Sequence, residues 1–335
     1  MRILSIFEHR EVCESQVADH PRSELLRQLT FRNLAQAARL QWSWSHTSSL
    51  LVGAAIAWKD GFLNFPLLLL SWFCVELFHA ATCMTNDYWD YRSGADAVGE
   101  HTVFNAGSRV IQDGKISPSL LLIISFVCYA VGGVSGIFLV VTQGWPLLVF
   151  GVIGVALGYF YTAPPARLCY RGLDQLTVAI CYGPLTVLFS YYVQAQRFTS
   201  EVFLVGIIYA LTASMILYVK GFQDTEFDRR AQKESIVIKL GQRRAASFFI
   251  YFFLVAYLFI AAGILLGIIP PWTLVAAGSL PLALSARKAL REHSATGTAK
   301  SFFTLLIRTK SVHLYMGFLL IIGYMLMGIV ARFAR

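Results

Sequence analysis

Carboxylates gather in two short segments of this 335-residue sequence, and their spacing is the first feature that suggests chemistry. The first segment contains Asp87 and Asp90, three residues apart, and continues to Asp96. The second contains Asp224 and Asp228, four residues apart. Side chains three or four residues apart lie on one face of a helix. Each pair can therefore present two carboxylates to one ligand.

Carboxylate pairs of this kind suit a hard divalent cation. Mg²⁺ prefers oxygen ligands and is usually held by one or two carboxylates together with phosphate oxygens of a substrate. Basic residues accompany both segments, namely Arg109, Lys115, Lys220, Arg229, Arg230, Lys233 and Lys239. Lys and Arg bind phosphate oxygens directly, and metal ions neutralise and bridge them. The two segments predict a site for Mg²⁺ and a diphosphate, and solvated loops with local ion pairs are the alternative.

These segments need a scaffold, and the composition indicates a membrane protein. Hydrophobic residues make up 56% of the chain and charged residues 14%, whereas soluble domains carry about 25% charged residues. A helix needs about 20 mostly apolar residues to cross a bilayer. Nine stretches qualify: 40–58, 62–84, 119–141, 145–163, 174–194, 201–219, 246–268, 271–287 and 312–331. We expect an all-α polytopic fold, with about nine transmembrane helices around a central cavity.

The basic residues predict the orientation of this bundle. Of 28 Lys and Arg residues, 24 lie before residue 40 or around the loops that follow the second, fourth, sixth and eighth stretches. Cytoplasmic loops carry such an excess of basic residues. The net charge of +9 therefore indicates membrane orientation and not nucleic-acid binding. We expect a cytoplasmic N-terminal segment, 1–39, and a single domain, 40–335, in the inner (plasma) membrane of the cell. Both acidic segments then lie in cytoplasmic loops, which places the active site on that side.

The paired acidic segments resemble the two motifs of the UbiA superfamily of intramembrane aromatic prenyltransferases. Asn86-Asp87-x-x-Asp90 with Asp96 is similar to the first motif, and Asp224-x-x-x-Asp228 is similar to the second. The expected number of spans and their sidedness agree with that superfamily. The resemblance extends over nearly the whole chain.

Within the superfamily, the sequence looks like the 1,4-dihydroxy-2-naphthoate prenyltransferases of menaquinone and phylloquinone synthesis. The similar segments are Gly94-x-Asp96, Gly-Ser-Arg-Val at 107–110, and Tyr-Arg-Gly-Leu at 170–173. Two segments depart from that branch, because Asp174-Gln175 replaces Gly-Glu and the residues before Asp224 differ. The acceptor therefore stays open between naphthoate and other rings such as 4-hydroxybenzoate, homogentisate or a specialised metabolite.

The resemblance implies Mg²⁺-dependent transfer of a prenyl group from an allylic diphosphate to an aromatic acceptor, with release of diphosphate. The implied metal ligands are Asp87, Asp90 and Asp96 for one ion and Asp224 and Asp228 for another, and all of these except Asp96 are also the implied catalytic residues. The implied substrate-binding residues are Asn86, Arg109, Lys220, Lys233 and Lys239 for the diphosphate, Tyr161 for the carbocation and Arg171 for an acceptor carboxylate. The expected partners are both substrates and the lipid bilayer, and no nucleic acid.

A transporter of a cation or a phosphorylated solute is the rival class. Transporters hold their ions near the middle of the bilayer, on interrupted helices. Here the acidic residues lie at one end of two predicted spans. This position favours the enzyme over the transporter.

Overall fold

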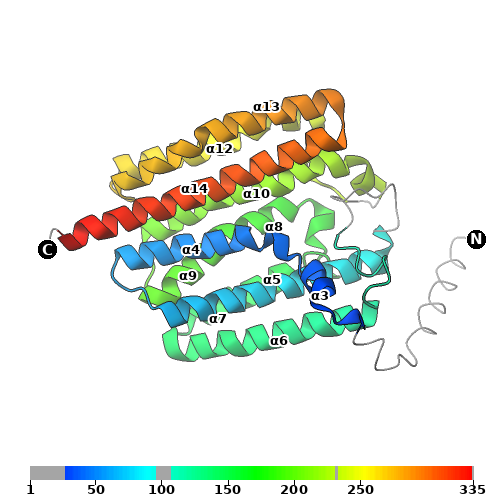
Figure 1. The fold of residues 1–335 in the computed structure, drawn as a ribbon, viewed down its shortest axis with the longest axis horizontal. Helices are drawn as coiled ribbons and strands as arrows, with labels where there is room; N and C mark the ends of the chain where they lie inside the picture. The colour runs from blue at the N-terminus through cyan, green and yellow to red at the C-terminus, as the bar shows by residue number, and fades with distance from the viewer. Residues whose placement is uncertain (1–26, 96–106, 231–232, 334–335) are drawn as a thin grey trace, which may run out of the picture.

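The computed structural model describes residues 27–95, 107–230 and 233–333, and every regular element in these ranges is helical (Figure 1). The first elements are α3 (Phe31–Ala37), η1 (Leu40–Trp42), α4 (Ser43–Lys59), α5 (Phe65–Ser93), α6 (Pro118–Gln143) and α7 (Pro146–Tyr159). A broken helix follows as η3 (Leu168–Arg171), α8 (Asp174–Ile180), η4 (Cys181–Leu185) and α9 (Thr186–Ala195). The remaining elements are α10 (Ser200–Arg230), α11 (Ile236–Leu240), α12 (Gln242–Leu265), η5 (Pro271–Ser279), α13 (Leu280–Thr296) and α14 (Ala299–Phe333).

Six of the described helices are long and apolar enough to cross a membrane, so the chain is a polytopic helical membrane protein. They are α5, α6, the unit Asp174–Ala195, α10 as far as Thr225, α12 and α14. Three other predicted spans correspond to shorter elements: α4 has 17 residues, α7 has 14, and the eighth stretch divides into η5 and α13. In α6 only 17% of an 18-residue apolar stretch is buried inside the protein. Its remaining apolar side chains therefore face outward, as lipid contact requires.

The bundle is built around a core shared by α4, α9, α10 and α14, which lie side by side in Figure 1. Val52, Tyr191, Tyr209 and Tyr324 are buried in this core, one from each helix. Gly53 lies where a Cβ atom would collide with the backbone of α9. Small residues let membrane helices approach closely, so Gly53 sets the spacing between α4 and α9.

Two helices extend past the predicted ends of their spans, which corrects the prediction that the acidic segments are loops. The stretch 62–84 becomes a helix that ends at Ser93, and the stretch 201–219 becomes one that ends at Arg230. Gly94 ends α5 in the left-handed conformation, with φ of 72°, which glycine adopts without strain. Asp87, Asp90, Asp224 and Asp228 therefore lie on helices, and the spacing of each pair does place its members on one helical face.

The fifth predicted span is interrupted in its middle. Residues Cys181–Leu185 form a π-helical turn that contains Pro184, and Gly183 has non-helical dihedral angles. Side chains donate to two backbone carbonyls of the interrupted turn. Ser49 Oγ donates to Tyr182 O at 2.5 Å, and Thr186 Oγ1 donates to Cys181 O at 2.6 Å. Turns of this kind are frequent at functional sites.

A polar cluster joins three helices at the end of the bundle opposite the acidic segments. Asp60 accepts hydrogen bonds from Tyr191 at 2.6 Å and Arg197 at 2.9 Å, and Lys59 lies 2.5 Å from Glu201. Burial alone would raise the pKa of Asp60, but the bonds from Tyr191, Lys59 and Arg197 lower it overall. Asp60 therefore stabilises the folded protein as a carboxylate.

We predict that Asp60→Ala destabilises the bundle by about 2 kcal/mol, because charge-assisted bonds contribute on that order. Thermal unfolding in detergent measures the loss. Asp113→Ala is the matched control, because Asp113 also pairs with two cations, Arg109 and Lys115, but on an exposed surface. Exposed pairs contribute about 0–1 kcal/mol, so equal losses in the two variants would contradict the prediction.

Candidate active site

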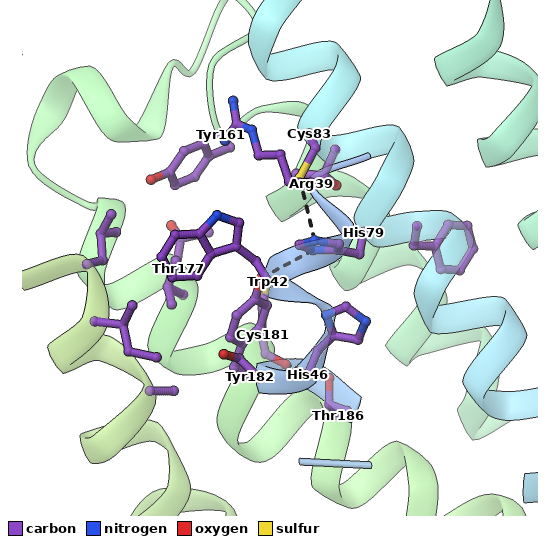
Figure 2. Close-up of a pocket in the computed structure, with 18 of the residues that line it drawn as sticks. Arg39, Trp42, His46, His79, Cys83, Tyr161, Thr177, Cys181, Tyr182 and Thr186 are labelled. Carbon is purple, nitrogen blue, oxygen red and sulfur yellow. Dashed lines mark hydrogen bonds between the residues drawn. The ribbon is translucent and has the colours of Figure 1, made fainter. Parts of the chain in front are cut away.

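A cavity of about 590 Å³ lies between α4, α5, α7, the broken helix, α10 and α14 (Figure 2). One end is polar and is lined by Arg39, Asn86, Gly107, Tyr161 and Lys220. Much of the remaining wall is apolar, with Phe78, Phe150, Gly154, Leu185, Phe189, Phe303 and Ile307, although His46, His79 and Lys310 also line it. The cavity thus combines a charged end with a space suited to hydrocarbon.

Asp87 is the most enclosed carboxylate at the polar end, with 3% of its surface exposed. Arg39 and the hydroxyl of Ser108 contact its two oxygens, and the backbone N–H of Ser108 donates to Oδ1 at 3.2 Å. Arg39 also donates to Asn86 Oδ1 at 2.7 Å. Burial alone would lower the pKa of Arg39, but Asp87 raises it above its ordinary value. A partly buried ion pair therefore holds Asp87 in place.

Asp90 lies one turn further along α5 and has three partners. Tyr170 donates to Oδ1 at 2.7 Å, while Lys233 and Asn86 donate to Oδ2 at 3.2 Å each. The Lys233 ammonium also lies 4.9 Å from the ring centre of Tyr170. Burial would lower the pKa of Lys233, but Asp90 and then Cys169, Tyr170 and Asp228 raise it. Lys233 is thus a permanent cation between the two acidic helices.

The carboxylates of α10 are less well neutralised. Asp224 Oδ1 is buried and has no hydrogen-bond partner among the described residues. Burial raises the pKa of Asp228 to about 6, against the opposing influence of Lys233. Asp224 and Asp228 are therefore oxygen donors that the protein's own cations leave partly unsatisfied.

The carboxylates of α5 and α10 fit Mg²⁺ as two pairs of ligands and do not form a complete coordination shell by themselves. Within the described residues no three His, Cys, Asp or Glu side chains converge closely enough to hold a metal by themselves. Mg²⁺ commonly takes only one or two carboxylates and completes its shell with water and substrate phosphate. The orphaned oxygen of Asp224 and the pairing of acids across α5 and α10 agree with that mode of binding.

The structure brings eight of the predicted site residues to this end of the bundle: Asn86, Asp87, Asp90, Tyr161, Lys220, Asp224, Asp228 and Lys233. Of these eight, Asn86, Tyr161 and Lys220 line the cavity itself. Three other predicted residues have different partners. Arg109 pairs with Asp113 at 3.4 Å, Arg171 donates to the Pro165 carbonyl at 3.2 Å, and Lys239 pairs with Glu234 at 3.0 Å. Asp96 lies outside the described residues.

Several site residues are missed by sequence reasoning. Arg39 belongs to the segment that we expected to be separate from the domain, yet it contacts Asp87. Ser108 and Tyr170 were noticed only as parts of similar segments, without a role. Nothing in the spacing of these residues points to the carboxylates, because each contact joins distant parts of the chain.

Comparison with known proteins assigns the family. The model of the UbiA prenyltransferase family matches residues 47–330. The chain belongs to this family. Its fold agrees: a UbiA homologue from Archaeoglobus fulgidus, solved bound to GPP and Mg²⁺, superposes with a TM-score of 0.58 at 14% identity, covering 86% of this chain and 99% of that one.

Two relatives narrow the comparison within the family. The 1,4-dihydroxy-2-naphthoate octaprenyltransferase of Bacillus subtilis is 25% identical over 280 residues, which cover 83% of this chain and 87% of the relative. The 2-carboxy-1,4-naphthoquinone phytyltransferase of Synechocystis is 31% identical over 204 residues, covering 60% of this chain and 63% of the relative. Both names describe prenyl or phytyl transfer to a naphthalene ring.

Gly107, in the segment between α5 and α6, offers a test of how closely that segment packs against Asp87. It has φ of +60°, and a Cβ atom there would lie 2.6 Å from Asp87 Oδ1. Gly107→Ala should cost more than the roughly 1–2 kcal/mol of a left-handed alanine, because the methyl group also displaces a buried carboxylate. Thermal unfolding measures this. Gly114→Ala is the control, since Gly114 has φ of +65° and no atom within 4 Å, and an equal loss there would refute the close contact.

Proposed function

We propose that the protein transfers a prenyl group from an allylic prenyl diphosphate to 1,4-dihydroxy-2-naphthoate in quinone biosynthesis, releasing diphosphate. The observation that carries this proposal is a largely apolar cavity whose polar end, lined by Arg39, Asn86 and Lys220, adjoins the two carboxylate pairs of α5 and α10. The family match and the naphthoate-specific names of the two relatives support it.

In this proposal Mg²⁺ is held by the two acidic helices. Asp87 and Asp90, with Asp96, hold one ion, and Asp224 and Asp228 hold the other. When bound, Mg²⁺ neutralises the charge that develops on a leaving diphosphate. The unpaired Oδ1 of Asp224 supports this assignment, since a buried oxygen without a partner is costly unless a ligand satisfies it.

The protein's own cations bind the diphosphate in the proposal. Lys220 lines the polar end of the cavity, and Lys233 already lies beside Asp90. Arg39 has a buried Nε without a partner in the described structure, so it can donate to an additional oxygen. Arg109 also has a buried nitrogen, Nη1, without a partner among the described residues, so it keeps its proposed part in binding the diphosphate. Lys239 stays a further proposed ligand of the diphosphate, and Arg171 one of an acceptor carboxylate.

The rest of the cavity accommodates the prenyl chain. Phe150, Leu185 and Phe189 supply apolar surface, and exclusion of water protects an allylic cation from hydrolysis. Tyr161 lines the polar end of the cavity, beside Arg39 in Figure 2. Its ring face can stabilise positive charge.

We also propose nine membrane crossings, with the acidic ends of α5 and α10 facing the cytoplasm. The crossings are α4, α5, α6, α7, the unit α8–α9, α10, α12, the unit η5–α13, and α14. The distribution of Lys and Arg supports this orientation in the inner membrane. Residues 1–39 then begin on the cytoplasmic side, and residues 40–335 form the catalytic domain.

The decisive experiment supplies the purified protein in lipid nanodiscs with Mg²⁺ and allylic diphosphates of increasing length. Each diphosphate is paired with dihydroxynaphthoate, 4-hydroxybenzoate, homogentisate or no acceptor, and the products are identified by mass. Mg²⁺-dependent prenyl-naphthoquinol with loss of CO₂ is the expected result. Transfer only to another ring would overturn the proposed acceptor, and absence of transfer to every ring would overturn the proposed function.

Asp224→Asn should lower kcat by about 10²-fold or more, because it removes negative charge from a group proposed to hold the metal that stabilises the leaving group. Initial rates at saturating substrates, repeated over a Mg²⁺ titration, measure the change. Asp113→Asn alters an exposed carboxylate outside the cavity and should keep the wild-type rate. Full activity in Asp224→Asn would refute the metal assignment.

A further inference from the structure

His46, in the cavity wall, belongs to a chain of polar side chains that lies away from the acidic helix ends. Ser43 Oγ donates to Glu76 Oε1 at 2.6 Å, and His46 Nε2 lies 2.8 Å from Glu76 Oε2. His46 is 1% exposed and lines the cavity (Figure 2). Ionisable side chains inside a membrane bundle are costly and usually functional, and none of these three has a part in binding the diphosphate.

The hydrogen bonds define which nitrogen of His46 is available. A carboxylate only accepts hydrogen bonds, so the Nε2 atom that faces Glu76 carries the proton. Nδ1 is then a hydrogen-bond acceptor. It is buried and has no partner among the described residues. Buried polar atoms are nearly always paired, so this atom calls for a donor from a ligand in the cavity.

Neighbouring aromatic groups hold the His46 ring in position. The ring of His79 lies 4.4 Å from it, centre to centre. Both nitrogens of His79 already have partners: Tyr182 OH at 3.2 Å from Nδ1, and Cys83 Sγ at 3.6 Å from Nε2. Tyr182 belongs to the π-helical turn η4. Of the two histidines, only His46 has a ring nitrogen without a partner in the described part of the chain.

The depth of His46 and His79 in the cavity suits the second substrate, the aromatic acceptor. His79 precedes Asp87 by eight residues on α5, which is about 12 Å along a helix that rises 1.5 Å per residue. That length accommodates a metal-bound diphosphate and an aromatic ring beyond it. A ring stacked near His46 and His79 would therefore lie close to the first carbon of the prenyl chain.

We propose that His46, oriented by Glu76, accepts a hydrogen bond from a ring hydroxyl of the aromatic acceptor and takes that proton during transfer. This inference rests on the proposed function. It assigns the acceptor's chemical class, a hydroxylated aromatic ring, to a site formed by His46, His79 and Tyr182, with Glu76 behind His46.

The proton and electrons balance in this step. The allylic C–O bond breaks, and its electron pair leaves with the diphosphate. A π electron pair of the ring carbon beside the hydroxyl forms the new C–C bond, and the hydroxyl proton moves to His46 Nδ1, which leaves a ketone. Where that carbon carries a carboxylate, loss of CO₂ returns an electron pair to the ring, and His46 returns the proton to the oxygen. Glu76 stabilises the protonated imidazole in between.

The test compares Glu76→Gln and His46→Phe with the control His313→Gln in nanodiscs. His313 is equally buried, but Thr212 and the Ser45 carbonyl occupy its two nitrogens and it does not line the cavity. General acid–base catalysis contributes about 10²–10⁴-fold, so both site variants should lose at least 10²-fold in kcat, with KM for the prenyl diphosphate unchanged. His313→Gln should keep the wild-type kcat. Unchanged kcat in Glu76→Gln would overturn the proposal.

A second measurement separates hydrogen bonding from mere structural support. The wild type and Glu76→Gln are assayed with the acceptor and with its O-methyl ethers, which lack one hydroxyl proton each. If His46 takes that proton, one ether slows the wild type strongly and slows Glu76→Gln little further, because the two changes remove the same interaction. If the loss caused by every ether simply adds to the loss caused by Glu76→Gln, the proposal is overturned. This comparison does not need the His46→Phe variant, so it holds even if that variant does not fold.

The wild-type protein separates the two ways of failing. If it transfers prenyl groups to no aromatic ring, the proposed function fails and this inference fails with it. If it transfers them and the Glu76 variant is unaffected, the proposed function stands and His46 is only structural.

Discussion

The enclosure of four carboxylates, two of them buried, at the ends of two membrane helices is the constraint on which the rest of this structure depends. An unpaired charge in a medium of low dielectric constant is strongly unfavourable, so Asp87 and Asp90 require cations from elsewhere in the chain. Arg39 reaches Asp87 from the segment before α4, and Lys233 reaches Asp90 from the segment after α10. The ion pairs thereby join the N-terminal segment, α5 and the region after α10 into one unit.

The same ion pairs explain how a site built for a charged ligand stays folded without it. Breaking a buried pair is costly because it leaves one charge uncompensated. A diphosphate that arrives with divalent cations brings both signs of charge at once. Arg39 and Lys233 could then move their bonds to phosphate oxygens while the metal takes their places at the carboxylates. The proposed chemistry therefore exchanges partners within a nearly neutral cluster.

The sequence predicted what is local and missed what depends on distant contacts. Spacing correctly placed Asp87 with Asp90, and Asp224 with Asp228, on shared helical faces. It ended both helices too early, because polar residues lower the hydropathy of the last turns although the backbone continues to Ser93 and Arg230. The structure also gives Arg109, Arg171 and Lys239 nearby partners that the sequence did not indicate.

The unpaired nitrogen of His46 suggests where acceptor selectivity arises. The charged end of the cavity recognises a diphosphate whatever ring is attacked, and the apolar wall cannot distinguish similar hydrocarbons by much more than size. A site built to hydrogen-bond a substrate hydroxyl rejects analogues that lack it by about 10⁴–10⁵-fold, because the buried partner is left unsatisfied. Glu76 and Ser43 sharpen this discrimination by fixing one tautomer of His46. Selectivity for the ring and activation of the diphosphate therefore lie at different depths of the same cavity, on opposite parts of α5.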